Sequence, residues 1–174
     1  PYIVGTTGFR ENHRQVFEKY AKDAALLLSP NMSLGVNLLF KLAPLIATAL
    51  GASYDIEIIE AHHRVKADAP SGTAKRLGEL IAEALGRNLD QTGVYGRKGL
   101  TGERSEEEIG IHSVRGGDIT GDHTVLYAGT GERVELTHRA HSREAFAYGT
   151  IRAIEFVLKA KPGLYDMMDA LALK

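Results

Sequence analysis

The densest group of chemically active side chains lies in residues 60–74, which read EAHHRVKADAPSGTA. This segment contains two adjacent histidines, His62 and His63, and two cations, Arg64 and Lys66. A histidine titrates near neutrality and can deliver a proton in a reaction that runs at pH 7. Because adjacent residues of a strand point to opposite faces, we expect the two histidines to have different roles.

A helix start with the features of an anion site follows the histidines. Ser71 or Thr73 can cap free amide groups, and Gly72 lets a ligand approach the backbone. Amides of a first helical turn, together with the helix dipole, favour a carboxylate or a phosphate. A capped helix without a ligand is the simpler alternative, but the nearby Arg64 and Lys66 favour the anion.

The residues do not indicate a metal site or a standard nucleotide loop. His62, His63 and Asp68 lack a recognised zinc spacing, and the chain has no cysteine, which excludes disulfides and thiolate ligands. Neither GxGxxG nor GxxxxGK[ST] occurs. The small residues of the turn at 5–8 can let a ligand lie against the backbone. From the residues alone we infer an anion-binding site with a general acid.

Composition narrows the class of protein. The chain has 174 residues, a formal net charge of −1, 44% hydrophobic and 25% charged residues, as in an ordinary globular domain. This balance argues against a nucleic-acid or anionic-membrane partner held by bulk charge. The apolar stretch 33–50 contains Asn37, Lys41 and Pro44, which make it a poor membrane span.

The elements that must position these residues change in character along the chain. Alternating strands and helices in the first 50 residues predict the end of a parallel α/β layer. We expect them at 2–8, 12–22, 24–28 and 33–50, with Pro44 kinking or splitting the last helix. Further strands are predicted at 54–58, 109–114, 124–128 and 134–138, and further helices at 71–85 and 144–160.

Residues 60–74 closely resemble the signature of the dihydrodipicolinate reductases, a family of bacterial lysine and diaminopimelate synthesis. Other segments resemble family segments in family order, so the resemblance covers essentially the whole chain. They are IVGTTGF at 3–9, SPNMSLGVN at 29–37, YGRKGLTGER at 95–104, VRGGDITGDHTV at 114–125, GERVELTHRAHSR at 131–143 and GLYDMMD at 163–169.

The resemblance implies an α/β fold with two parts. Residues 1–33 are expected to be the C-terminal remnant of a Rossmann-type dinucleotide-binding domain with a parallel sheet. Residues 34–143 would form an α+β substrate-binding and tetramerisation domain with a mixed four-stranded sheet. A last helix, in 144–174, would return to the nucleotide domain. The family resemblance also implies a cytoplasmic homotetramer.

The resemblance further implies reduction of dihydrodipicolinate, or hydroxy-tetrahydrodipicolinate, to tetrahydrodipicolinate by hydride transfer and protonation. His62 matches the catalytic acid/base, and Lys66 matches a second proton donor. His63 matches a substrate contact. Gly72 and Thr73 would hold one carboxylate of the cyclic imine dicarboxylate at the helix start, the ligand class that the anion features indicate independently.

NADH or NADPH is the cofactor that the resemblance implies, and no metal is expected. The residues that match its binding positions come from two loops and are Gly5, Thr6 and Thr7 in the first loop and Ser29, Pro30, Asn31 and Met32 in the second. Arg143 matches a further position near the cofactor. The residue that chooses between the two coenzymes has no counterpart in the chain.

Two departures from the family pattern affect the expectations. Val65 stands where a third histidine is usual and Ala67 where valine is common, and we expect tuning of the site rather than its loss. The family's first strand and glycine-rich phosphate loop are missing. We therefore expect a chain that lacks most of the nucleotide-binding domain and is inactive alone. A non-catalytic dicarboxylate-binding or assembly module is the alternative.

Overall fold

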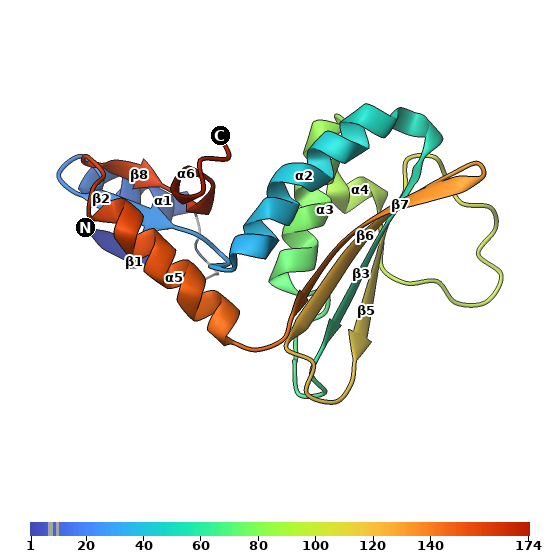
Figure 1. Ribbon diagram of the computed structural model, residues 1–174. Helices are drawn as coiled ribbons and strands as arrows, with labels where there is room; N and C mark the ends of the chain where they lie inside the picture. Colours follow the sequence, from blue (N-terminus) through green and yellow to red (C-terminus); the bar gives the residue numbers. More distant parts are fainter. Residues whose placement is uncertain (7–8, 10) are drawn as a thin grey trace. The chain divides into compact units, whose positions relative to one another are not determined.

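The computed structural model describes residues 1–6, 9 and 11–174, and it divides the chain into two compact units (Figure 1). The first unit combines Pro1–Leu38 with Arg143–Lys174, and the second is Leu39–Ser142. Thr7, one of the residues matched to cofactor binding, lies outside the described residues.

The first unit is built on a parallel sheet of three short strands. Its elements are β1 (Tyr2–Val4), α1 (Glu11–Tyr20), β2 (Ala25–Leu28), the start of α2 (Leu34–Leu50), α5 (Glu144–Val157), β8 (Gly163–Tyr165) and α6 (Met167–Ala170). The strand order is β1-β2-β8, with Leu26 opposite Tyr2 on one side and Leu164 on the other. The predicted parallel layer is therefore confirmed. The sequence did not reveal β8 or α6, because three or four residues are too few to establish a periodicity.

A small apolar core holds α5 against this sheet. Leu27 of β2 is fully buried and packs with Ala153 and Val157 of α5. Gly149 of the same helix allows the closest approach, since a Cβ added there would lie 1.7 Å from the carbonyl oxygen of Met32. The loop after β2 is thus fixed against α5 by backbone contact.

The second unit contains a mixed five-stranded sheet of order β4-β5-β3-β6-β7. Its elements are the continuation of α2, the 3₁₀ turn η1 (Gly51–Ser53), β3 (Asp55–His62), α3 (Gly72–Ala84), α4 (Leu89–Thr92), β4 (Gly93–Val94), β5 (Ile109–Arg115), β6 (Gly121–Gly129) and β7 (Glu132–Ala140). β4, β5 and β3 run parallel, whereas β6 and β7 are antiparallel to their neighbours. The two residues of β4 extend the four-stranded sheet that the resemblance implied.

The helices α2 and α3 lie on one face of this sheet (Figure 1). Along β3, Ile56, Ile58, Glu60 and His62 alternate onto the buried face. Tyr127 of β6 is fully buried on the same face. Its hydroxyl donates a hydrogen bond to the carbonyl of Ala43 in α2 at 2.7 Å, which ties the helix to the sheet.

Pro44 was expected to kink or split its helix, and of these two effects the split does not occur, since α2 runs unbroken from Leu34 to Leu50. Phe40, Ala43 and Ala47, which lie on both sides of the proline, are all buried. The free energy gained by burying this apolar face on both sides of the proline exceeds the cost of the one backbone hydrogen bond that the proline removes. Leu34–Ser53 is long and apolar enough to cross a membrane, but a core helix of a soluble protein meets the same criterion.

We predict that Gly149→Ala destabilises the first unit. Helix propensity alone would make alanine more stable by about 0.8–1 kcal/mol, but the added methyl overlaps the Met32 carbonyl. Forcing the loop and helix apart should cost about 1–3 kcal/mol net of this gain. Thermal unfolding measures the change. Ala147→Gly, an exposed position of the same helix, is the control for propensity, and a G149A chain as stable as the unchanged one would contradict the close packing.

Candidate functional site

The centre of the site is a buried carboxylate near the end of β3. Glu60 has no exposed surface, and each of its carboxylate oxygens accepts two hydrogen bonds. Arg115 of β5 donates through both terminal nitrogens at 2.8 Å, one to each oxygen. The backbone amide of Ser71 donates to Oε1 at 3.1 Å, and the ring of His62 contacts Oε2 at 2.5 Å.

These partners keep Glu60 ionised. Burial alone would raise the pKa of this carboxyl, but the hydrogen bonds from Arg115, Ser113, His62 and the Ser71 amide together lower it to about 2. The same contact raises the pKa of the Arg115 guanidinium. A buried ion pair of this kind tolerates the loss of neither partner, because the remaining charge would be uncompensated.

His62 is the last residue of β3 and is 9% exposed. Its Nδ1 faces Glu60, so the ring has one nitrogen, Nε2, left for other chemistry. A Cβ added at Gly121 would lie 3.1 Å from this Nε2. The glycine therefore keeps space open beside the nitrogen that is not held by Glu60.

His123 of β6 packs edge-on against the His62 ring, with 5.1 Å between the ring centroids. It is 3% exposed, and its Nε2 is 3.1 Å from the hydroxyl of Ser71. Burial, reinforced by the charge of His62, lowers the pKa of His123 to about 3. His123 is therefore neutral at pH 7, and it acts as a packing and hydrogen-bonding partner rather than as an acid.

The predicted helix start is present directly beside this group. α3 begins at Gly72, with Ser71 as its N-cap and the Ser71 hydroxyl accepting from the amide of Ala74 at 3.2 Å. Gly72 is exposed and has open space where a Cβ would stand. Since the first turn of a helix leaves amides without intrahelical acceptors, Gly72 and Thr73 lie where an anion is favoured.

The remaining predicted residues lie on the loop between β3 and α3. His63 is half-buried, and its Nδ1 has no hydrogen-bond partner among the described residues. Lys66 Nζ contacts the two carboxylate oxygens of Asp68 at 2.7 and 3.0 Å, which lowers the pKa of Asp68. Val65, the departure from the family pattern, is 80% exposed and does not enter the buried group.

Sequence reasoning located the segment but missed three residues that complete the site. Glu60 was counted as one of its acids without a role, although its place two residues before His62 puts both on one strand face. Arg115 and His123 come from other strands. No local signal links them to residues 60–74, because the sheet alone brings them there.

The predicted cofactor loops of the first unit also lie together. Gly5 follows β1 and Ser29 follows β2, so both stand at the carboxyl edge of a parallel sheet, where α/β proteins bind ligands. A Cβ at Gly5 would lie 3.2 Å from Cε of Met32, so the loops touch. Thr6, next to Gly5, is exposed.

Hydrogen bonds within the second loop hold it in shape. The Ser29 hydroxyl donates to the Asn31 carbonyl at 2.8 Å, and the Asn37 amide donates to the same oxygen at 2.8 Å. Ser29 is 1% exposed, so its side chain shapes the loop. Pro30 is exposed, and Arg143 stands at the N-cap position of α5 without a side-chain capping bond.

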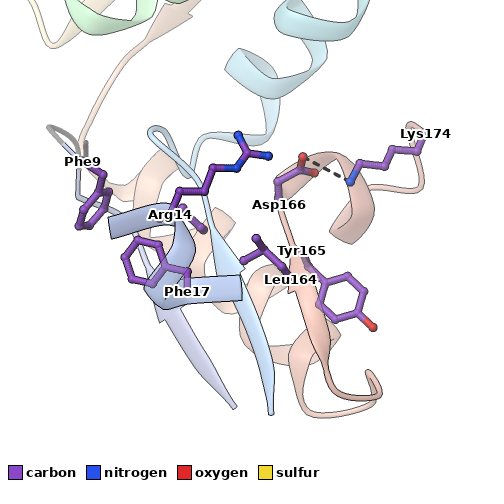
Figure 2. A pocket seen from close by; sticks show the side chains of 8 residues that line it. Phe9, Arg14, Phe17, Leu164, Tyr165, Asp166 and Lys174 are labelled. Atoms are coloured by element: carbon purple, nitrogen blue, oxygen red, sulfur yellow. Dashed lines mark ion pairs between the residues drawn. The ribbon is translucent and has the colours of Figure 1, made fainter. Parts of the chain in front are cut away.

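A hollow of about 440 Å³ opens at the same edge of the sheet (Figure 2). Its lining comes from α1 and the segment before it, from the ends of β2 and β8, and from the chain end. It comprises Phe9, Arg14, Phe17, Leu28, Leu164, Tyr165, Asp166 and Lys174. Asp166 and Lys174 form an ion pair at 3.4 Å. Of the predicted cofactor residues that the structure describes, none is in this lining.

A second charged group lies on the opposite face of β3. Glu57 accepts hydrogen bonds from Arg97 and Arg104 at 2.9 to 3.1 Å, and its Oε2 is 2.6 Å from Nε2 of His112. Burial would raise the pKa of Glu57, but these partners lower it to about 2.

Over the described residues, no group of three or more His, Asp or Glu side chains could hold a metal ion.

Comparison with known proteins gives a consistent result. The family model described as dihydrodipicolinate reductase, C-terminus, matches residues 35–171. The 4-hydroxy-tetrahydrodipicolinate reductase of Syntrophus aciditrophicus is 53% identical over 174 residues, which is 100% of this chain and 65% of that protein. The reductase of the same name from Syntrophobacter fumaroxidans is 55% identical over 172 residues, 99% of this chain and 64% of that one.

A solved structure shares the fold. The dipicolinate-bound dihydrodipicolinate reductase from Paenisporosarcina sp. TG-14 superposes with a TM-score of 0.73 at 30% identity. The match covers 96% of this chain and 63% of that one. The chain thus spans about two thirds of the length of each of these proteins, 65% in the Syntrophus case.

We predict that His123 makes the protein sensitive to mild acid. Its pKa falls from 6.5 to about 3 on folding, so between these values the unfolded chain binds a proton that the folded chain does not. Stability therefore declines as the pH falls from about 6.5 towards 3. Replacing His123 by Gln should flatten the dependence of the unfolding free energy on pH in this range.

Urea unfolding at a series of pH values measures the slope of the unfolding free energy against pH. A loss of stability that is the same at every pH does not change this slope. His141→Gln, at an exposed position, is the control and should keep the slope of the unchanged chain. An H123Q chain with an unaltered slope would show that His123 is not the titrating group.

Proposed function

Because the chain belongs to the dihydrodipicolinate reductase family, whose C-terminal family model covers most of it, we propose that it serves that reaction. The reaction is the reduction of dihydrodipicolinate, or hydroxy-tetrahydrodipicolinate, to tetrahydrodipicolinate in lysine and diaminopimelate biosynthesis. The observation that carries the proposal is the placement of His62, held by a buried carboxylate, next to the helix start at Gly72.

The substrate in this proposal is a cyclic imine dicarboxylate. The amides at Gly72 and Thr73 receive one carboxylate, because the first turn of α3 and its dipole favour an anion. Lys66 and His63, on the preceding loop, supply further donors. Dipicolinate, bound in the similar structure from Paenisporosarcina, is a flat cyclic dicarboxylate of this class.

His62 and Lys66 act on the proton side of the reaction. When bound, NADH or NADPH supplies a hydride to the conjugated ring. The imidazolium of His62 gives its Nε2 proton to complete the addition and becomes neutral imidazole, while Nδ1 stays bonded to Glu60. Lys66 is the second donor, and its positive charge also stabilises the substrate carboxylate.

The cofactor residues in this proposal line the two loops at the carboxyl edge of the β1-β2-β8 sheet. Gly5 and Thr6 belong to the first loop and 29–32 forms the second, and Thr7 is assigned to the cofactor from its sequence position. The fit is supported by the small residue at Gly5, which leaves backbone accessible, and by the hydrogen bonds that hold 29–32 rigid. Arg143 is assigned to the same ligand.

We assign residues 1–33 and 144–174 to the nucleotide side and 34–143 to the substrate side. We also propose a cytoplasmic homotetramer, with no nucleic-acid or membrane partner. The sheet of the second unit supports assembly, because its outer face exposes apolar side chains such as Ile59 and Val114, which are 41% and 48% exposed.

We predict that dipicolinate binds to the chain and that Lys66→Ala weakens binding about 10-fold or more, because a hydrogen bond to a charged group contributes about 1.5–3 kcal/mol. Isothermal titration calorimetry measures this affinity. Lys22→Ala removes an exposed lysine of the first unit and should leave the affinity unchanged. A folded chain that gives no heat with dipicolinate would overturn the proposed substrate site.

We predict that His62→Gln lowers kcat by about 10²–10⁴-fold with little change in KM, since proton transfer and not binding is lost. The assay follows the oxidation of NADH and of NADPH in the presence of the cyclic substrate. It uses a fusion protein, in which the part of the Syntrophus relative that this chain does not match is joined to this chain. Lower affinity at unchanged kcat would make His62 a binding group. Dicarboxylate binding without turnover in the unchanged sequence would favour the non-catalytic module.

A further inference from the structure

We propose that Glu60 is the positioning residue of the site, which holds His62 as the Nδ1–H tautomer and thereby directs Nε2 towards the substrate. The kinetic part of this proposal rests on the proposed function, whereas the tautomer itself does not. Glu60 touches neither reacting atoms nor cofactor in this scheme, and it acts only through the imidazole ring.

The hydrogen bonds of Glu60 determine which atom is the donor. Oε1 accepts from the Ser71 amide and from Nη2 of Arg115, and Oε2 accepts from Nη1 of Arg115. All three are permanent donors, so the carboxylate that they surround stays an acceptor. The short contact of 2.5 Å between Oε2 and Nδ1 of His62 therefore requires a proton on Nδ1.

The remaining nitrogen has the surroundings of a reactive atom. Gly121 keeps the space beside Nε2 free of a side chain, since an added Cβ would stand 3.1 Å away. His123 touches the ring edge-on, and its own Nε2 is engaged by Ser71. The proton that Glu60 keeps on Nδ1 thus makes Nε2 the nitrogen that gains and gives a proton.

Charged and titratable groups face this pair from several elements. They are Arg115 on β5, His123 on β6 with His138 behind it on β7, and Lys66 and Asp68 on the loop before α3. Arg115 fixes Glu60 in place by its two-pronged contact, and its Nη2 also donates to the Asp68 carbonyl at 2.6 Å. The guanidinium thereby links the loop that carries Lys66 to the carboxylate that orients His62.

The opposite face of β3 offers a matched control. Glu57 also accepts from arginine nitrogens and contacts a histidine, His112, at 2.6 Å. It differs from Glu60 in facing away from His62. Glu57→Gln therefore disrupts a carboxylate, arginine and histidine group of the same chemistry without touching the His62 ring.

The test reads the ring nitrogens of His62 by ¹⁵N NMR of the folded chain, with the His62→Gln spectrum assigning the signals. In the neutral ring of the unchanged protein we expect a protonated Nδ1 and an unprotonated Nε2. In E60Q the side-chain amide can present either its oxygen or its NH2 group to Nδ1. When the NH2 group donates to Nδ1, the ring proton moves to Nε2, so the Nε2–H tautomer should appear. E57Q should leave the His62 signals unchanged. A major Nε2–H tautomer in the unchanged protein overturns the proposal without need of any variant.

The kinetic arm uses the same joined protein as the His62→Gln measurement. E60Q should lower kcat about 10–100-fold and change KM less than threefold. A loss of this size is expected when a reactive histidine loses a residue that hydrogen-bonds its ring without touching the substrate. Glu83→Gln, an exposed side chain on α3, should keep kcat. Unchanged kcat in a folded E60Q protein whose tautomer has shifted overturns the positioning role. If H62Q retains kcat, the proposed function of His62 fails while the tautomer result stands.

Discussion

A single buried negative charge organises the second unit. A carboxylate without exposed surface is costly unless its lone pairs are satisfied, and Glu60 meets this requirement with groups from three places. Arg115 comes from β5, the Ser71 amide from the start of α3 and the His62 ring from the end of β3 itself, and Arg115 also reaches the loop at Asp68. Each group that satisfies the charge is thereby fixed, and one of them, His62, carries the proposed proton transfer.

The alternation of β3 explains why one strand supports two separate charged groups. Glu60 and His62 lie on the face covered by helices, and Glu57 lies on the other face with Arg97 and Arg104. In the inner group Glu60 has no exposed surface, and this group belongs to the candidate site. The outer group ties the glycine-containing loop 95–104 to the sheet, and it offers a charged surface beside the exposed apolar residues of the same face.

The first unit works by a different principle. Its three short parallel strands end at one edge, where Gly5 and 29–32 meet. Little side-chain chemistry is needed there, because the helix α5 fixes the second loop by direct backbone contact at Gly149. A loop held in this way presents backbone groups in a constant arrangement, which suits a ligand that is positioned rather than polarised.

The sequence by itself determined the class of the fold, most of the helices and strands, and the segment 60–74. These follow from local properties: periodicity, turn residues and a capped helix start. It left open whether Pro44 kinks or splits its helix, because packing on both sides of the proline was not visible along the chain. The prediction of an anion site also came from local residues, since helix amides and neighbouring cations are adjacent in sequence.

Only the tertiary structure decided how the histidine is used. Arg115 lies 55 residues from Glu60 and His123 lies 52 residues from Ser71; pairing of β3 with β5 and β6, and packing of α3 on the sheet, bring each to its partner. The enclosed surroundings set both charges: burial makes His123 neutral because little there compensates a proton, whereas hydrogen bonds keep Glu60 charged although burial alone would raise its pKa. The identity of the reactive groups was local information, whereas their protonation and orientation depend on distant residues enclosed together.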